Sequence, residues 1–188
     1  MINIILAQSF GIAAAQELTF TPFSNIITYL NISDDLAAGN SRFVAEAKRA
    51  RNLLDVLNKV NNSDKFSIMA ADELFNGTTY KEGQAAAYSL IKQLGSSKNN
   101  ICIACTHFPK LTELEERTAH FANYKVAVNY DDEGKINYPY TLTRGTTDQI
   151  VTFDILKEEG FGDTFLTEAK NMLIKKNHVI TSFDRKNL

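Results

Sequence analysis

Apolar residues along the chain fall into short continuous runs that alternate with segments of helical spacing. The runs at 24–32 (SNIITYLNI), 65–72 (KFSIMAAD) and 100–107 (NICIACTH) are rich in β-branched and apolar residues and predict strands. Segments 41–60 and 79–95 carry apolar residues at helical spacing and predict helices. A strand–helix–strand–helix order with continuously apolar strands predicts a parallel α/β sheet that is covered on both faces.

The long helix predicted over 41–60 has an apolar stripe at i, i+4 and i+7 spacing, made by Phe43, Ala47, Ala50, Leu54 and Leu57. In the helix over 79–95, Thr79 and Glu82 have the spacing of a capping box, and Gly95 is expected to cap the carboxyl end. Both helices therefore have one apolar face for the sheet.

The remaining segments predict shorter elements. An amphipathic or buried helix is expected near the N-terminus, and Pro109 opens a short helix. Two alternating segments, 123–130 and 135–142, are joined by DDEG and predict a β-hairpin. Two helices are expected at about 148–159 and 163–174, followed by a polar tail at 176–188.

Composition is ordinary for one globular domain and changes this picture little. The chain has 188 residues, 44% of them hydrophobic and 22% charged, which is enough for one sizeable core. A net charge of -2 gives no electrostatic footprint for nucleic acid. The apolar N-terminus lacks a positive flank and is too short to span a membrane, so no membrane contact is predicted.

The two cysteines, Cys102 and Cys105, lie in one predicted strand. Their odd spacing puts the side chains on opposite faces, which argues against a shared metal ion or a redox pair. We expect both to be small core residues of a protein in a reducing compartment.

Polar side chains follow two of the predicted strands. Asp72 and Glu73 end one strand, and Thr106 and His107 end the next. Ligands of parallel α/β sheets bind at the carboxyl ends of the strands, where these residues are expected to meet. Paired carboxylates suit phosphate hydrolysis, in which one holds magnesium and the other orients water. The alternative is that both acids are merely solvated before a turn.

Four segments together resemble the ATPase domain of the DNA mismatch repair MutS family, within the ABC class of P-loop NTPases. They are ISDDLAAGNSRFVAEA, MAADELFNGTT, ACTHFPKLTELEE and NYKVAVNYDDEGKI, in that family's order and spacing. The resemblance implies an ABC-class, three-layer α/β sandwich with a mostly parallel sheet, followed by a β-hairpin and C-terminal helices. It assigns residues 1–175 to a partial ATPase domain.

The resemblance also implies residue roles. Asp72 would hold Mg²⁺ through a water, Glu73 would position the attacking water, and His107 would sense the γ-phosphate. Ser41 would contact the nucleotide bound by a partner subunit, and Asp34 and Asp35 would shape its loop. The alternatives are that His107 is an ordinary strand-end histidine and that Ser41 is an ordinary helix cap.

The chain departs from the family pattern in one large respect. It contains no G-x-x-x-x-G-K-[ST], and the resemblance implies that it begins within the helix that follows this P-loop, so the sheet is expected to lack the P-loop strand. Asn76 also stands where the family has arginine.

The expected function is part of a MutS-family ATPase domain that couples ATP hydrolysis to mismatch repair or related DNA transactions. ATP and Mg²⁺ would bind the intact parent protein, and neither is expected to bind this chain tightly. Partners would be a second ATPase domain in a homodimer, and DNA held by other domains, in the cytoplasm. The alternative is a non-catalytic dimerisation or regulatory module derived from MutS.

Overall fold

The structure is a computed structural model that describes residues 1–30, 32, 41–132 and 135–183. The predicted roles of Asp34 and Asp35 lie outside the described residues. The chain forms two compact units, Met1–Ala122 and Asn123–Leu188, and each is described by itself.

A three-stranded parallel sheet organises the first unit, in the order β1 (Asn25–Tyr29), β2 (Ser67–Asp72) and β3 (Asn100–Cys105). Helix α2 (Arg42–Asn61) connects β1 to β2, and α3 (Tyr80–Gly95) connects β2 to β3. The predicted parallel α/β order is therefore confirmed.

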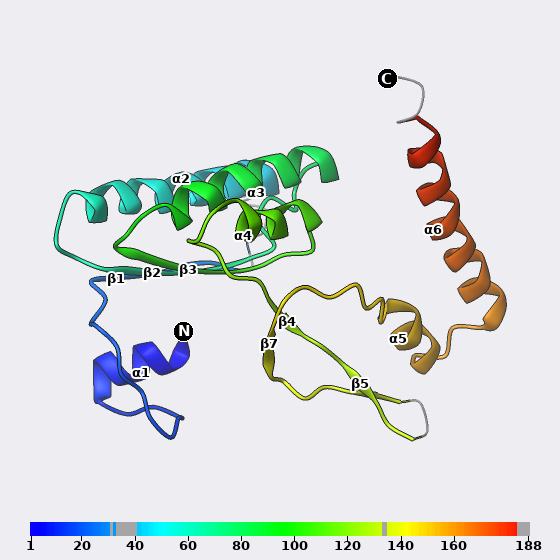
Figure 1. Ribbon diagram of the computed structural model, residues 1–188, viewed down its shortest axis with the longest axis horizontal. Helices are drawn as coiled ribbons and strands as arrows, with labels where there is room; N and C mark the ends of the chain where they lie inside the picture. The colour runs from blue at the N-terminus through cyan, green and yellow to red at the C-terminus, as the bar shows by residue number, and fades with distance from the viewer. Residues whose placement is uncertain (31, 33–40, 133–134, 184–188) are drawn as a thin grey trace. The chain divides into compact units, whose positions relative to one another are not determined.

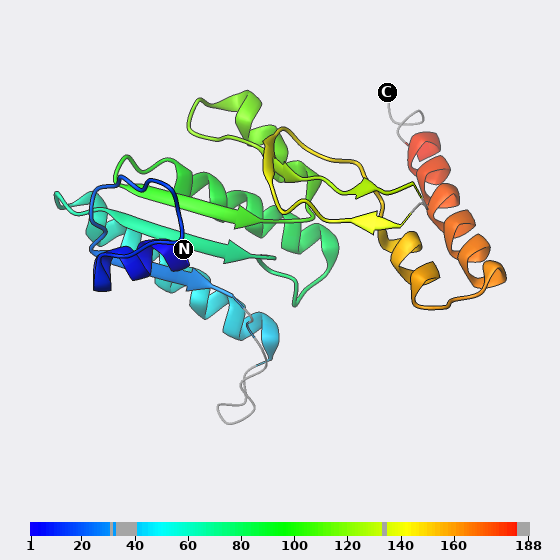
Figure 2. The same ribbon diagram turned by 90° about the horizontal axis from the view of Figure 1, so that it is seen from below.

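Helices α2 and α3 cover the same face of this sheet (Figure 1). Met69 and Ala71 of β2 point into the core beneath them, whereas Ile101 and Ile103 of β3 are more than half exposed. Helix α1 (Ile2–Phe10) lies on the other side of the sheet (Figures 1 and 2). None of its residues is buried. A parallel sheet with helices is thus established, and the three-layer sandwich stays a prediction.

The buried stripe of α2 differs from the predicted one. Its buried residues are Glu46, Ala50, Leu53, Leu57 and Val60. Phe43, predicted to lie in the core, is 40% exposed. The prediction missed the buried position in the second turn because it is occupied by a carboxylate, Glu46, which the hydrophobic pattern treats as a surface group.

Gly95 serves close packing rather than capping. It is the last residue of α3, and Ser96 occupies the cap position in a right-handed conformation. A Cβ atom at Gly95 would lie 2.3 Å from the ring of Phe121. The predicted cap is therefore wrong, since the glycine instead makes room for an aromatic side chain.

After β3 the chain forms a short helical segment, as predicted from Pro109. It consists of a 3-10 turn η1 (Pro109–Glu113) and one turn of α-helix, α4 (Leu114–Arg117). Leu111 and Leu114 are buried in the core of the first unit, which attaches this segment to α3.

The second unit contains the predicted hairpin, formed as two short antiparallel ladders. Strand β4 (Tyr124–Val126) pairs with β7 (Leu142–Arg144), and β5 (Asn129–Tyr130) pairs with β6 (Ile136–Asn137). Two helices follow, α5 (Thr152–Glu158) and α6 (Asp163–Phe183). Helix α6 continues past residue 175, and the predicted domain limit at that residue stays a prediction. Across the described part of the chain, every helix is too short or too polar to cross a membrane.

Candidate functional site at the carboxyl edge of the sheet

Asp72 is the last residue of β2, and its side chain is exposed at the carboxyl edge of the sheet. It lies opposite Cys105 in the ladder with β3. The next residue, Glu73, still donates its backbone N–H to the Cys105 carbonyl at 3.1 Å. The sheet therefore holds the backbone of both acids at the point where the strand ends.

The turn after Asp72 has an unusual backbone. Glu73 has φ 48° and Phe75 has φ 59°, which is the left-handed region that residues with a Cβ rarely adopt. Such conformations cluster at functional sites and persist only where the surrounding structure imposes them.

Buried contacts impose this turn. Leu74 and Phe75 lie in the core, and the Phe75 N–H donates to the Tyr29 hydroxyl at 3.3 Å. Tyr29 is itself buried, and burial raises its pKa to about 12, so it stays a neutral partner of the turn. The core thus fixes two residues of the turn, and Glu73 stays half exposed beside them.

The Glu73 carboxylate lies between two side chains from different segments. Asn76 Nδ2 donates to Oε2 at 2.5 Å, and His107 Nδ1 lies 3.6 Å from Oε1. The second distance is too long for a direct hydrogen bond but allows an ion pair when the imidazole is protonated. The expectation that Glu73 and His107 meet at one sheet edge is confirmed, and their catalytic roles stay predictions.

His107 is held by aromatic neighbours. Its ring centroid lies 4.5 Å from that of Phe108 and 6.3 Å from that of Tyr80. Phe108 is buried, and its N–H donates to Thr106 Oγ1 at 3.0 Å. Thr106 therefore shapes the strand end, while the imidazole remains half exposed beside Glu73.

Ser41 occupies the N-cap position of α2 with an extended backbone, and its side chain is exposed. Within the described residues its hydroxyl makes no capping hydrogen bond, although its carbonyl accepts the Ala45 N–H at 3.1 Å. The interpretation of Ser41 as an ordinary cap therefore lacks the bond that defines a cap.

The cysteines lie on opposite faces of β3, as predicted, but only Cys102 packs against the core. Burial raises the pKa of the Cys102 thiol to about 11. Cys105 is exposed, so its assignment to the core is wrong: the strand end leaves its outer face uncovered. Partial burial, followed by the charges of Asp72 and Glu73, raises the pKa of the Cys105 thiol. In the described part of the chain, no cluster of three or more metal-binding side chains occurs.

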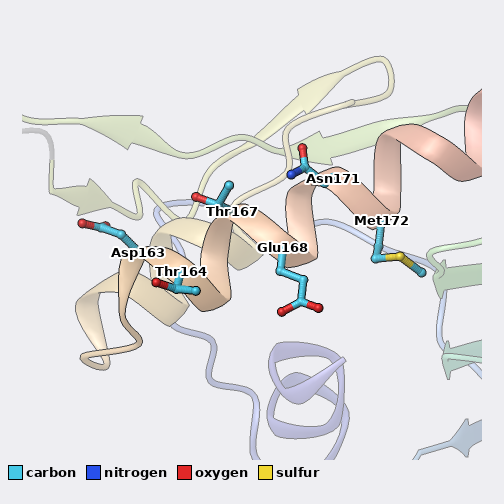
Figure 3. Close-up of a pocket in the computed structure, with 6 residues that line it drawn as sticks. All are labelled: Asp163, Thr164, Thr167, Glu168, Asn171 and Met172. Atoms are coloured by element: carbon cyan, nitrogen blue, oxygen red, sulfur yellow. The ribbon is translucent and has the colours of Figure 1, made fainter.

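A pocket in the second unit is a weaker candidate. All six lining residues belong to α6, and Figure 3 shows their side chains spread along the helix rather than converging on one point. Binding sites combine convergent polar groups with concave apolar walls, which a single helix face does not supply. The carboxyl edge of the sheet remains the better candidate.

Sequence reasoning missed two residues that build this edge, Tyr29 and Glu46. The pattern predicts Tyr29 as a strand residue without a further role, although its hydroxyl accepts the Phe75 N–H of the turn. Glu46 is 1% exposed and accepts the Gly77 N–H at 3.0 Å. The available signal was its position, four residues after Arg42 and in line with the apolar positions of α2.

The acid pair and the histidine lie at the carboxyl ends of adjacent parallel strands, which is where open α/β sheets bind their ligands. The family model of MutS domain V matches residues 1–176, and the chain belongs to this family. It corresponds to the C-terminal ATPase region of MutS proteins.

Curated relatives support this assignment. The DNA mismatch repair protein MutS of Clostridium botulinum (strain Loch Maree / Type A3) is 31% identical over 171 residues, covering 90% of this chain and 18% of the relative. The MutS protein of Streptococcus uberis is 27% identical over 172 residues, covering 92% of this chain and 20% of the relative. The chain thus spans about a fifth of the length of these relatives.

Proposed function

We propose that this chain provides the acid-bearing part of a MutS-type ATPase site that serves DNA mismatch repair or a related DNA transaction. The observation that carries the proposal is the approach of the Glu73 carboxylate to within 3.6 Å of His107, beside Asp72, at the ends of adjacent parallel strands. The three-layer P-loop architecture, a homodimer, DNA contacts through other domains and a cytoplasmic location belong to the same proposal.

Asp72 suits an outer role toward Mg²⁺. It is an exposed carboxylate at the carboxyl edge of the sheet. Magnesium in phosphoryl-transfer sites is held by one or two carboxylates together with waters and phosphate oxygens, so a single acid acting through water fits. When bound, the ion would neutralise charge on the phosphates.

Glu73 is suited to orient a water molecule. The Asn76 amide fixes one of its oxygens, and each carboxylate oxygen retains a further acceptor site. A fixed acceptor within hydrogen-bond reach of a water can align it for attack and take its proton. His107, held against Phe108, offers an imidazole N–H toward a phosphate oxygen on the same edge.

The cofactor side of the proposal predicts weak nucleotide binding by this chain, because its sequence contains no P-loop. Hydrogen bonds to charged groups contribute about 1.5–3 kcal/mol each, so losing three moves a micromolar site to about millimolar or beyond. Calorimetric titration of the chain with ATP and Mg²⁺ measures this. A dissociation constant in the low micromolar range contradicts the prediction.

The catalytic assignment is tested in a chain joined at its N-terminus to a segment that carries G-x-x-x-x-G-K-[ST]. Glu73→Gln should retain ATP binding and abolish turnover, because an amide keeps the shape but cannot accept the proton. Asp55→Asn, an exposed acid on α2, is the matched control and should leave turnover unchanged. Hydrolysis by the Glu73 variant within a few-fold of the unmodified fusion means that Glu73 is structural.

The trans role of Ser41 has its own test in the same fusion protein. Its hydroxyl lies at a helix N-terminus, which favours anions. Subunits carrying Ser41→Ala are mixed with subunits carrying Glu73→Gln. If Ser41 serves the partner's nucleotide, mixed dimers contain one intact composite site and regain activity. Activity equal to the average of the two homodimers, where mixed dimers form, contradicts the trans role.

A further inference from the structure

Glu46 is a buried carboxylate with no part in the proposed chemistry. It lies in the second turn of α2, five residues after Ser41, and is 1% exposed. Its two oxygens have different partners: Oε1 accepts from Arg42 Nε at 3.1 Å, and Oε2 accepts from the Gly77 N–H at 3.0 Å. Burying a charge is unfavourable unless it is paired and hydrogen-bonded, and the two oxygens of Glu46 meet this condition through two different segments, the first turn of α2 and the turn at Gly77.

Gly77 shows how closely the turn after Glu73 approaches α2. A Cβ atom at this position would lie 3.0 Å from the Phe43 backbone nitrogen and 3.1 Å from Glu46 Oε2. A side chain at this position would therefore require its neighbours in α2 to move by a few tenths of an ångström. The Glu46 carboxylate bridges the contact that the glycine permits.

A ring contact joins the same two segments. Phe43 in the first turn of α2 lies with its ring centroid 6.3 Å from that of Phe75, which the core holds. The start of α2 and the acid-bearing turn are thus joined by a buried polar bridge and an aromatic contact.

We propose that Glu46 is a positioning residue that ties the start of α2, which bears Ser41, to the turn that bears Glu73. This inference rests on the proposed function for its meaning. There, Ser41 serves the partner's nucleotide and Glu73 serves the chain's own nucleotide, so Glu46 links two neighbouring sites through one rigid contact. A displacement of α2 at one site then moves the acid of the other.

Substitutions at Glu46 separate reach from charge. Glu46→Gln keeps the length of the side chain and an oxygen that accepts from Gly77. Glu46→Asp keeps the charge but withdraws the carboxylate by one methylene, and Glu46→Ala removes the group. A positioning role requires a side chain long enough to accept the Gly77 N–H. Simple charge pairing with Arg42 requires only the negative charge.

Amide hydrogen exchange at Gly77 in the full chain measures the hydrogen bond between Gly77 and Glu46, and it needs no nucleotide. In the unmodified chain the Gly77 amide should exchange at least tenfold slower than in an unstructured peptide of the same sequence. Exchange should rise by no more than a few-fold in Glu46→Gln and by tenfold or more in Glu46→Asp and Glu46→Ala. Unprotected Gly77 in the unmodified chain, or the reverse order of the Gln and Asp variants, overturns the proposal.

Nuclear magnetic resonance signals distinguish positioning from general stability. Glu46→Asp should shift the signals of Glu73 and of the Asn76 side-chain amide. Two controls lie on the same helix: Asp55→Asn, whose exposed pair with Arg51 has the same 3.1 Å separation, and Leu57→Ala, which weakens the core. Neither should shift those signals, and equal shifts in Leu57→Ala overturn the proposal. Because these experiments use no ATP, they can fail while the ATPase assignment stands, and the reverse also holds.

Discussion

The two edges of the parallel sheet end in polar residues of different kinds. At the amino edge the groups are neutral and bind one another. Ser67, fully buried, donates its hydroxyl to Asn100 Oδ1 at 2.7 Å, and Asn100 Nδ2 donates to the Leu94 carbonyl at 3.0 Å. Asn99 Nδ2 donates to the Ser63 carbonyl at 3.1 Å. These side chains therefore bond to one another and to neighbouring carbonyl groups.

The carboxyl edge is charged and partly open. Asp72 is exposed, Glu73 and His107 are about half exposed, and the turn between the strand and α3 includes two residues with positive φ. Neutral groups that satisfy one another hold a fold together, whereas charged groups on a constrained backbone are available to a ligand. The difference between the edges therefore predicts a structural role for the polar groups of the amino edge and a functional role for those of the carboxyl edge, and it can be measured.

The largest expected effect comes from Gly83→Ala, which disturbs the packing of α3 against the turn at the carboxyl edge. A Cβ atom at Gly83 would lie 2.5 Å from the Phe75 carbonyl oxygen, so α3 and the turn must separate. We expect a loss of about 3 kcal/mol in the free energy of unfolding, at the upper end of overpacking effects. Gly95→Ala is the control, because the flexible Phe121 side chain that it meets can move. Equal losses in urea unfolding would show that the turn is not closely held.

The amino edge is tested by Asn100→Ala. This change removes the acceptor of the buried Ser67 hydroxyl and the donor to Leu94, and it should lower the free energy of unfolding by about 1–3 kcal/mol. Ser67→Ala combined with Asn100→Ala should lose less than the sum of the single changes, because the two groups share one bond. Additive losses in urea unfolding would contradict a shared network.

Acids at the carboxyl edge should behave in the opposite way. Asp72→Asn and Glu73→Gln should each change the free energy of unfolding by no more than about 0.5 kcal/mol, as surface substitutions usually do. The measurement is again urea unfolding, with Asn100→Ala as the sensitive reference. A loss above about 1 kcal/mol at either acid would make the carboxyl edge structural like the amino edge.

The sequence predicted the elements better than the environment of individual side chains. The three strands and two long helices follow from the hydrophobic pattern, and placing Glu73 and His107 together needed only the rule that parallel strands end at one edge. Glu46 was missed because hydrophobic patterning treats every carboxylate as a surface group. Its burial depends on Gly77, which is 31 residues away in the chain.

The uncovered face of β3 was missed for a related reason. Ile101 and Ile103 belong to an apolar run that predicts burial on both faces, yet both are more than half exposed. A run of apolar residues indicates that both faces of a strand can be buried. Whether another element covers each face depends on the tertiary arrangement, which the run itself does not specify. Cys105 was misplaced by the same reasoning.

The smallest expected effect is a rate difference at Cys105, which reports the field of the acid pair. Partial burial and then the charges of Asp72 and Glu73 raise the pKa of this thiol, because negative neighbours disfavour the thiolate. Asp72→Asn removes one of those charges, so the pKa of Cys105 should fall and the thiolate fraction at pH 8 should rise. Alkylation by iodoacetamide should then become a few-fold faster, since the thiolate is the nucleophile.

Cys102, whose pKa of about 11 is caused by burial, should react slowly in both proteins and serve as the internal control. Peptide mass spectrometry over time separates the two sites. An unchanged rate at Cys105 would mean that solvent screens Asp72 even at the thiol opposite it in the ladder, and the carboxyl edge would then differ from the amino edge in exposure but not in electrostatic field.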